Sequence, residues 1–349
     1  MERLKILDGL RVVAILMVMA FHYCYLFNST LYQIDLPREL FKYGYLGVEL
    51  FFIISGFVIT LTLTKTNNFI NFIKKRWIRL FPGMLICSVL TFSIISLFDT
   101  NNFFPNSKSV VNLIVSNTFV SPALINSILN TQTSFIDPPY WSLWVEIQFY
   151  ILIGILYFLN KKHFIRNFTW VAVLLSSLFY FSHLTGIFAE KTEWFLRVVL
   201  EIFNFSQHAL WFVLGVLIYK LYFVAKERQT IALVFIVALM QCWFLNFELY
   251  ILAFLIFITF VFYCFLYNQS LLHFLTNSKI QKIGIASYSI YLIHQNIGLL
   301  FIEKLTQTFG IYNFTLPVLV SVGFCYIGVI IYRFFEKPIG AYFKKIMLQ

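Results

Sequence analysis

One apolar stretch of the chain carries residues that can bind an anion and transfer a proton. This stretch, 7–27 (LDGLRVVAILMVMAFHYCYLF), contains Asp8 and Arg11 near one end and His22 near the other. A charged or titratable side chain costs several kcal/mol in hydrocarbon unless it faces a polar cavity or a partner, so such residues indicate a functional site. In a helix, Arg11 and His22 would be about 16–17 Å apart along the axis and within about 20° of one face. This face therefore predicts a cation at one depth and a proton-transfer group at another.

Two carboxylates are expected at the depth of His22. Glu49 lies near the start of the apolar run 44–64, and Glu146 lies near the start of the run 140–159. Counting ~1.5 Å per residue from the outer ends of these runs puts both groups at about that depth. A carboxylate there can orient the imidazole and stabilise its protonated form, which suits a general base that takes a proton from a hydroxyl. The alternative is a buried polar network that fixes helix packing.

Arginines at the opposite depth favour an anionic ligand. Arg76 and Arg79, in KKRWIRLFP, are three residues apart and share a face if the segment is helical. The planar guanidinium can bind two phosphate oxygens at once. Together with Asp8 and Arg11, these arginines predict a site for an anionic ligand that enters from the cytoplasm. Basic anchoring of a helix end is the alternative for the arginine pair, but it does not account for Arg11 inside an apolar run.

A second histidine lies in the stretch SYSIYLIHQN. His294 is near mid-membrane by the helical rise, with Tyr291 on the approach. This histidine either lines the same cavity as the first one or is a hydrogen-bonded interior residue. Near the C-terminus, Arg333 and Glu336 are expected to form a structural salt bridge.

The composition indicates what must position these residues. Of the 349 residues, 60% are hydrophobic and 12% are charged, and the mean hydropathy is +0.82. A soluble domain is about 25% charged, so this is a polytopic membrane protein. We expect an all-α fold with about ten transmembrane helices in a single membrane-embedded domain over 1–349, without a fused extracytoplasmic esterase-like domain. The predicted spans are 7–27, 44–64, 80–98, 140–159, 168–184, 207–223, 230–246, 249–267, 283–302 and 315–334.

The distribution of basic residues predicts the orientation. With the N-terminus inside, 19 of the Lys and Arg residues fall on the inner side and 6 on the outer side. Because cytoplasmic loops are rich in Lys and Arg, both termini are expected in the cytoplasm, and the formal charge of +11 reflects topology rather than nucleic-acid binding. A crossing at 110–130 would place the basic residues of the next loop outside, so this apolar segment is expected to be interfacial or re-entrant. The five cysteines have no metal-ligand spacing, and no metal site is expected.

Several stretches, in this order and spacing, resemble the acyltransferase-3 family of integral-membrane O-acyltransferases over nearly the whole chain. LDGLRVVAILMVMAFH is similar to the family's first-helix signature, and GYLGVELFFIISGFVIT is similar to its second-helix motif. RWIRLFP carries the family's Arg-x-x-Arg, and YWSLWVEIQFY resembles its Trp-Ser-Leu-x-x-Glu segment. SYSIYLIHQ and YRFFEKP resemble late-helix signatures. Many members have Asp where this chain has Glu49, a change that keeps the charge.

The resemblance implies transfer of an acyl group, commonly acetyl from acetyl-CoA, to a hydroxyl of a cell-surface polysaccharide or lipid-linked sugar in the bacterial cytoplasmic membrane. The partners would be acyl-CoA, this acceptor and membrane lipid. A proton-coupled transporter of a sugar-lipid or anion is the alternative, but it predicts inverted repeats, which the sequence lacks. A non-catalytic scaffold would leave the membrane charges unexplained. The expected site residues are His22, Glu146 and Arg11 for catalysis, Arg11, Arg76, Arg79 and Asp8 for donor binding, and Glu49, Ser142, Trp141, Tyr291 and His294 for support.

Overall fold

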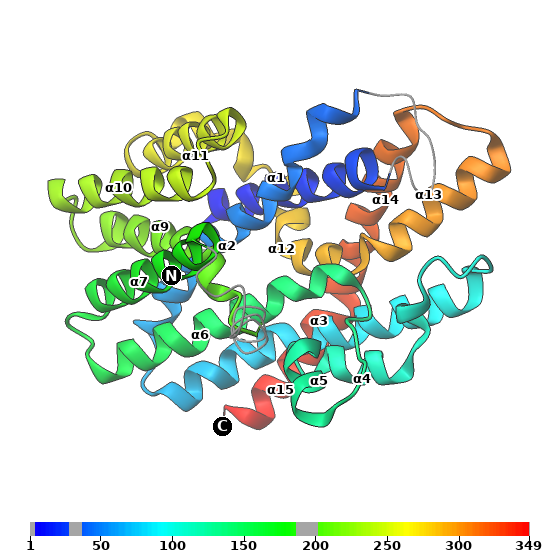
Figure 1. Cartoon of the computed structure of the whole chain (residues 1–349), viewed down its shortest axis with the longest axis horizontal. Helices are drawn as coiled ribbons and strands as arrows, with labels where there is room; N and C mark the ends of the chain where they lie inside the picture. The colour runs from blue at the N-terminus through cyan, green and yellow to red at the C-terminus, as the bar shows by residue number, and fades with distance from the viewer. Residues whose placement is uncertain (1–3, 28–36, 186–201, 349) are drawn as a thin grey trace. The chain divides into compact units, whose positions relative to one another are not determined.

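The chain folds into helices joined by short loops (Figure 1). The computed structural model describes residues 4–27, 37–185 and 202–348, and no β-strand occurs among them. Within these residues, seven helices are long and apolar enough to cross a membrane, or up to nine if each of two bent helix pairs counts as one span. The all-α class and the presence of several helices able to cross a membrane are therefore confirmed for the described residues. The count of ten spans and the cytoplasmic placement of both termini stay predictions.

The described residues form two compact units, each built from separate stretches of the chain. The first contains Met1–Val48, Lys74–Ser142 and Leu275–Gln349, and the second contains Glu49–Ile73 and Leu143–Phe274. The elements mainly in the first unit are α1 (Lys5–Ala20), η1 (Phe21–Leu26), η2 (Arg38–Tyr45), α3 (Phe69–Phe98), η3 (Pro105–Lys108), α4 (Val110–Asn117), α5 (Pro122–Leu129), η4 (Pro138–Tyr140), α12 (Ser278–Ile293), α13 (Asn296–Phe309), α14 (Thr315–Ile331), η6 (Tyr332–Glu336) and α15 (Lys337–Met347). Those mainly in the second are α2 (Leu46–Leu63), α6 (Trp141–Leu159), α7 (Phe164–Thr185), α9 (Phe205–Phe223), α10 (Arg228–Phe244), α11 (Leu249–Tyr267) and η5 (Gln269–Thr276).

Helix α12 is the centre of the first unit, because both α1 and α14 pack against it. A Cβ atom on Gly284 of α12 would collide with the backbone oxygen of Asp8 in α1. A Cβ atom on Gly328 of α14 would collide with Ile290 of α12. Small residues allow such close approach between membrane helices, where packing rather than water exclusion stabilises association. The start of α1 lies against the start of α12 and their ends also meet, so the two helices run in the same direction.

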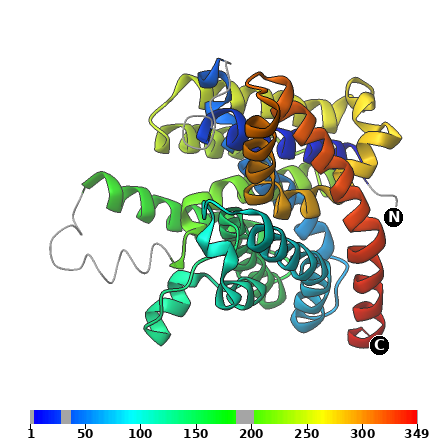
Figure 2. The ribbon, with the colours of Figure 1, turned by 90° about the vertical axis from the view of Figure 1, so that its right-hand side faces the viewer.

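Two π-helical turns interrupt the α-helices of the first unit. Turn η1 follows α1, and η6 joins α14 to α15, where Figure 2 shows one continuous rod. A π-turn adds a residue to the helical turn and so moves the side chains beyond it to a different face. The expectation of a regular α-helix over 7–27 was therefore wrong for Phe21–Leu26, which include His22. Hydropathy does not reveal a π-turn, because the run stays apolar.

The predicted span 283–302 is broken rather than continuous. Its two halves, α12 and α13, are bent by 76°. Backbone groups released at the break need new partners in apolar surroundings. The hydroxyl of Tyr140 donates to the C=O of Leu292 at 3.1 Å, and the N–H of Asn296 donates to the carboxylate of Asp137 at 3.3 Å. These tertiary partners stabilise a break that the apolar run alone does not predict.

The segment 110–130 forms two short helices, α4 and α5, bent by 110° relative to each other. Each contains eight residues, about 12 Å of helix, so neither alone crosses a hydrocarbon core of about 30 Å. The side chains of Ser109 and Ser121 cap them by accepting backbone N–H groups of the first turn. The segment is therefore not one straight span.

The second unit packs its helices around aromatic side chains. The ring of Phe212 lies 4.2 Å from that of Phe149 and 4.6 Å from that of Phe52, measured between centroids. A Cβ atom on Gly215 of α9 would collide with the backbone oxygen of Ile53 in α2, so these two helices cross closely. Figure 1 shows α10 beside α9 and α11. Aromatic contacts and close helix crossings therefore hold this unit together.

Two buried aspartates outside the membrane-spanning helices have opposite environments. Burial raises the pKa of Asp99, but two backbone N–H groups and the ammonium of Lys108, 3.2 Å away, together hold its pKa below the usual value. Burial raises the pKa of Asp137 well above the usual value, and the N–H of Asn296 offsets this only in part. Ionisation in the folded state is thus favoured at Asp99 and disfavoured at Asp137.

We expect Asp99→Asn and Asp137→Asn to change stability in opposite directions. The depressed pKa of Asp99 contributes stability above the unfolded pKa of about 3.9, and this contribution is lost as the pH falls through the folded pKa. Asp99→Asn should therefore lower the thermal midpoint at pH 7, by an amount that shrinks towards pH 4. The raised pKa of Asp137 favours folding most below about pH 3.9 and costs stability as the pH rises. Asp137→Asn should raise the midpoint increasingly between pH 4 and 7.

The two variants control for each other, since each replaces a buried aspartate by the uncharged side chain of the same shape. The measurement is thermal unfolding of the detergent-solubilised protein at several pH values. Equal changes of the same sign would contradict the electrostatic assignment.

Candidate functional site

Two histidines of the first unit contact each other. Nδ1 of His22, in η1, lies 3.2 Å from Nε2 of His294, at the break between α12 and α13. The ring centroids are 4.9 Å apart and the ring planes are inclined by 69°. His294 is fully buried and His22 is half-buried. The structure therefore pairs the two histidines that the sequence singled out separately.

Hydrogen-bonding side chains adjoin this histidine pair. The hydroxyl of Tyr291 donates to the C=O of Pro139 at 2.9 Å and lies 2.8 Å from the hydroxyl of Ser142. The centroid of the Tyr291 ring is 5.5 Å from that of His294. Trp141, the residue before Ser142, begins α6 and is partly exposed. Ser142, Tyr291 and the histidine pair thus form one cluster at the end of α12.

Asp8 and Arg11 form an ion pair at the other end of α12. Nη1 of Arg11 lies 2.7 Å from Oδ1 of Asp8, and the side chains are 24% and 2% exposed respectively. The backbone of Asp8 lies against Gly284, near the start of α12. Gly284 and His294 are separated by about 15 Å along the helix axis at ~1.5 Å per residue. Helix α12 therefore leads from a partly exposed cation to the histidine pair.

The arginine pair lies on α3, as predicted. Arg76 and Arg79 are three residues apart in this helix. The guanidinium of Arg79 pairs with Glu336 and lies 5.3 Å from the centroid of the Tyr288 ring. The hydroxyl of Ser289 donates to the other oxygen of Glu336 at 2.5 Å. Because Tyr288 and Ser289 belong to α12, Arg79 lies against the same helix as the first ion pair.

The expected salt bridge between Arg333 and Glu336 was wrong. The Glu336 side chain is 4% exposed and pairs with Arg79, whereas Arg333 is exposed, with its guanidinium 5.4 Å from the Phe334 ring centroid. The cause is the π-turn η6, which turns Glu336 towards α3 and leaves Arg333 on the outside. Spacing in a regular helix would have placed the two residues on one face.

The two predicted supporting carboxylates have partners within the second unit. Oε1 of Glu49 lies 2.9 Å from Nδ1 of His208, and the hydroxyl of Ser55 donates to Glu146 at 2.6 Å. Sequence reasoning missed both partners. His208 offered a signal, as a titratable residue in an apolar run, whereas Ser55 offered none. The expectation that Glu49 and Glu146 support His22 stays a prediction.

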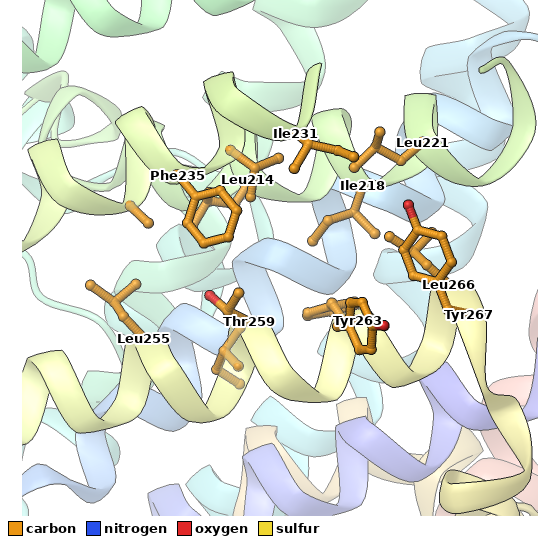
Figure 3. A pocket seen from close by; sticks show the side chains of 14 residues that line it. Leu214, Ile218, Leu221, Ile231, Phe235, Leu255, Thr259, Tyr263, Leu266 and Tyr267 are labelled. Atoms are coloured by element: carbon orange, nitrogen blue, oxygen red, sulfur yellow. The ribbon is translucent and has the colours of Figure 1, made fainter. Parts of the chain in front are cut away.

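An apolar pocket of about 250 Å³ lies within the second unit, between α9, α10 and α11 (Figure 3). Its lining includes Leu214, Ile218, Phe235, Leu255 and Tyr263. The lining residues include no histidine, carboxylate or basic side chain. This pocket therefore offers neither a general base nor a phosphate-binding group.

The ion pair of Arg79 and Glu336 yields a stability prediction. Glu336→Ala should cost about 1–3 kcal/mol of unfolding free energy, because it removes the carboxylate that accepts from the buried Ser289 hydroxyl and pairs with the partly exposed Arg79. Arg333→Ala, three residues earlier in the same π-turn, should cost no more than about 0.5–1 kcal/mol, since its side chain is exposed. Denaturant titration of both purified variants checks this. Similar losses from the two substitutions would contradict the assigned pairing.

The chain is similar to a known protein family and to several O-acetyltransferases. The family model of an acyltransferase domain, acyltransferase-3, matches residues 4–333. The O-acetyltransferase OatA of Staphylococcus aureus is 28% identical, over 95% of this chain and 56% of that protein. An O-acetyl transferase of Shigella phage Sf6 is 28% identical, over 44% of this chain and 46% of that protein. A putative O-acetyltransferase of Staphylococcus aureus strain COL is 29% identical, over 49% of this chain and 28% of that protein.

These matches differ in how much of each protein they cover. This chain spans about half or less of the length of the curated relatives that it matches. No solved structure matches it significantly. The family model, in contrast, covers nearly all of the sequence and includes both ends of α12 and both histidines. The chain therefore belongs to the acyltransferase-3 family.

Proposed function

We propose that this protein is a membrane O-acyltransferase that moves an acetyl group from acetyl-CoA to a hydroxyl of a cell-surface polysaccharide or lipid-linked sugar in the bacterial cytoplasmic membrane. Membership of the family and the names of the relatives support acyl transfer to oxygen. The observation that carries the proposal is the contact between His22 and His294, one helix length away from the Asp8–Arg11 ion pair. A proton acceptor and a phosphate-binding cation are the two groups that this reaction needs.

The histidine pair suits the chemical step. A neutral imidazole nitrogen of His22 takes the proton from the acceptor hydroxyl as the hydroxyl oxygen attacks the thioester carbonyl carbon. A new C–O bond forms and the C–S bond of the donor breaks. The thiolate of CoA then leaves and receives the proton from the imidazolium. The products are the acetyl ester and free CoA, and His22 returns to its neutral form.

The cations suit the phosphates of the donor. Arg11 and Arg79 are each held by a carboxylate that is almost fully buried, while their own side chains are 24% and 42% exposed. Guanidinium groups bind phosphate through paired N–H donors, so these two residues are the proposed donor-binding groups, together with Arg76, three residues before Arg79 on α3. Asp8 then contributes by orienting Arg11.

Replacing His22 tests the proposed base. His22→Gln should lower kcat for acetyl transfer by about 10²–10⁴-fold, which is the usual contribution of a general base. Purified protein in lipid nanodiscs is incubated with radiolabelled acetyl-CoA and surface glycan from producing cells. His163→Gln, on a loop of the second unit, is the matched control and should keep wild-type activity. Loss of O-acetyl groups from surface glycan, measured by NMR in cells carrying His22→Gln, is the parallel result. Full activity of His22→Gln would overturn the proposal.

Replacing Arg11 tests donor binding. Arg11→Gln should raise KM for acetyl-CoA by about 10- to 100-fold, because a charge-assisted hydrogen bond is worth about 1.5–3 kcal/mol. KM for the glycan acceptor should not change. The Arg333→Ala variant controls for the loss of one positive charge elsewhere. An unchanged KM for acetyl-CoA would exclude Arg11 from the donor site.

A further inference from the structure

The break between α12 and α13 determines which nitrogen of His294 carries a proton. Nδ1 of His294 lies 2.7 Å from the C=O of Tyr291, one turn earlier. A carbonyl oxygen only accepts hydrogen bonds, so Nδ1 must be the donor. In the neutral ring, Nε2 of His294 then has a lone pair and is an acceptor. Nε2 is the nitrogen that faces His22.

The same reasoning determines the tautomer of His22. Its Nδ1 lies 2.9 Å from the C=O of Val18 and 3.2 Å from Nε2 of His294. Both of these groups are acceptors, so Nδ1 of His22 carries the proton and shares it between them. Nε2 of His22 is therefore unprotonated in the neutral ring. Among the residues that the structure describes, this nitrogen has no hydrogen-bond partner.

Contacts on its backbone and ring hold His294 in this orientation. The hydroxyl of Tyr23, the residue after His22, donates to the C=O of His294 at 2.5 Å. Tyr140 fixes Leu292, two residues earlier, from another part of the unit. His294 itself has no exposed surface. A ring this constrained can act as a fixed acceptor rather than as a second, mobile base.

We propose that His294 is a positioning residue, whose Nε2 lone pair, together with the C=O of Val18, holds His22 in the Nδ1–H tautomer and so aims the Nε2 lone pair of His22 at the acceptor hydroxyl. This inference rests on the proposed function of His22 as general base. When Nε2 of His22 takes the proton, the ring becomes cationic, and its Nδ1–H bond to His294 becomes charge-assisted and therefore stronger. His294 thereby stabilises the transition state more than the ground state, without contacting the substrate.

Two substitutions of similar size separate this role from packing. His294→Gln keeps an acceptor oxygen near the position of Nε2, whereas His294→Leu removes it. We expect His294→Leu to lower kcat at least about 10²-fold, with KM for acetyl-CoA unchanged. His294→Gln should recover at least a tenth of wild-type kcat. His163→Gln, which changes a histidine on a loop of the second unit, should stay within about threefold of wild type.

Nitrogen NMR tests the tautomer directly and does not depend on activity. In histidine-labelled protein, the His22 ring, assigned by its absence in His22→Gln, should show a protonated Nδ1 and an unprotonated Nε2. His294→Gln should keep the wild-type Nδ1 signal, and His294→Leu should shift it, because only one of the two acceptors, the C=O of Val18, then remains. An Nδ1 signal unchanged in His294→Leu, or a Leu variant as active as the Gln variant, would overturn the positioning role. If the wild type transfers no acetyl while the NMR pattern depends on His294, the proposed function fails and the histidine pairing stands.

Discussion

A helix that breaks in an apolar environment releases backbone groups that need new partners, and this constraint shapes the first unit. Two partners of the break between α12 and α13 come from another part of the chain, Tyr140 for one carbonyl and Asp137 for one amide. The ring of His294, at the break itself, is the partner of the Tyr291 carbonyl. Each of these hydrogen bonds requires a defined position of its donor and acceptor. The break thus fixes the rotamer of His294, and through His294 it fixes His22.

The two π-turns also determine the positions of particular side chains. In a regular α-helix, side chains return to the same face every 3.6 residues. A π-turn is wider, so it changes which of the residues that follow it point inward. Turn η1 contains His22, and turn η6 contains Glu336, so both turns position a residue of the candidate site. The His22 side chain contacts His294 at the break after α12, and the Glu336 side chain pairs with Arg79 on α3. Irregular backbone therefore coincides with the candidate site.

The sequence predicted the helices well, because the signal is hydropathy and its length scale is set by the bilayer. The run 44–64 corresponds to α2, 249–267 matches α11, and the run 80–98 lies within α3. The titratable residues inside these runs were also recognisable, since such residues are rare in hydrocarbon. Their partners were not. A period of 3.6 residues predicts which side chains share a face only while the helix is regular. It therefore predicted neither the break at His294 nor the π-turn at Glu336.

Contacts between segments distant in the sequence could not be predicted, for a different reason. Counting residues from the helix ends placed Glu49 and Glu146 at the same depth in the membrane. Equal depth does not determine which helices are adjacent, so it does not predict the partner of either carboxylate. The structure gives Glu49 the side chain of His208 and gives Glu146 that of Ser55. Serine is common in membrane helices and carries no signal of its own. Only the packing of the second unit selects these pairs.

The distribution of exposure within the two ion pairs explains how buried acids beside α12 leave positive charge partly exposed. Asp8 and Glu336 are 2% and 4% exposed, whereas their partners Arg11 and Arg79 are 24% and 42% exposed. A buried carboxylate orients a guanidinium and neutralises its charge only on the side that it contacts. The remaining face of the guanidinium stays partly open, and because it is planar, its orientation is set by the carboxylate. An isolated lysine at the same depth would be free to reach for water and would present no fixed face. Each buried carboxylate therefore fixes the orientation of its guanidinium, which is what recognition of a polyphosphate requires.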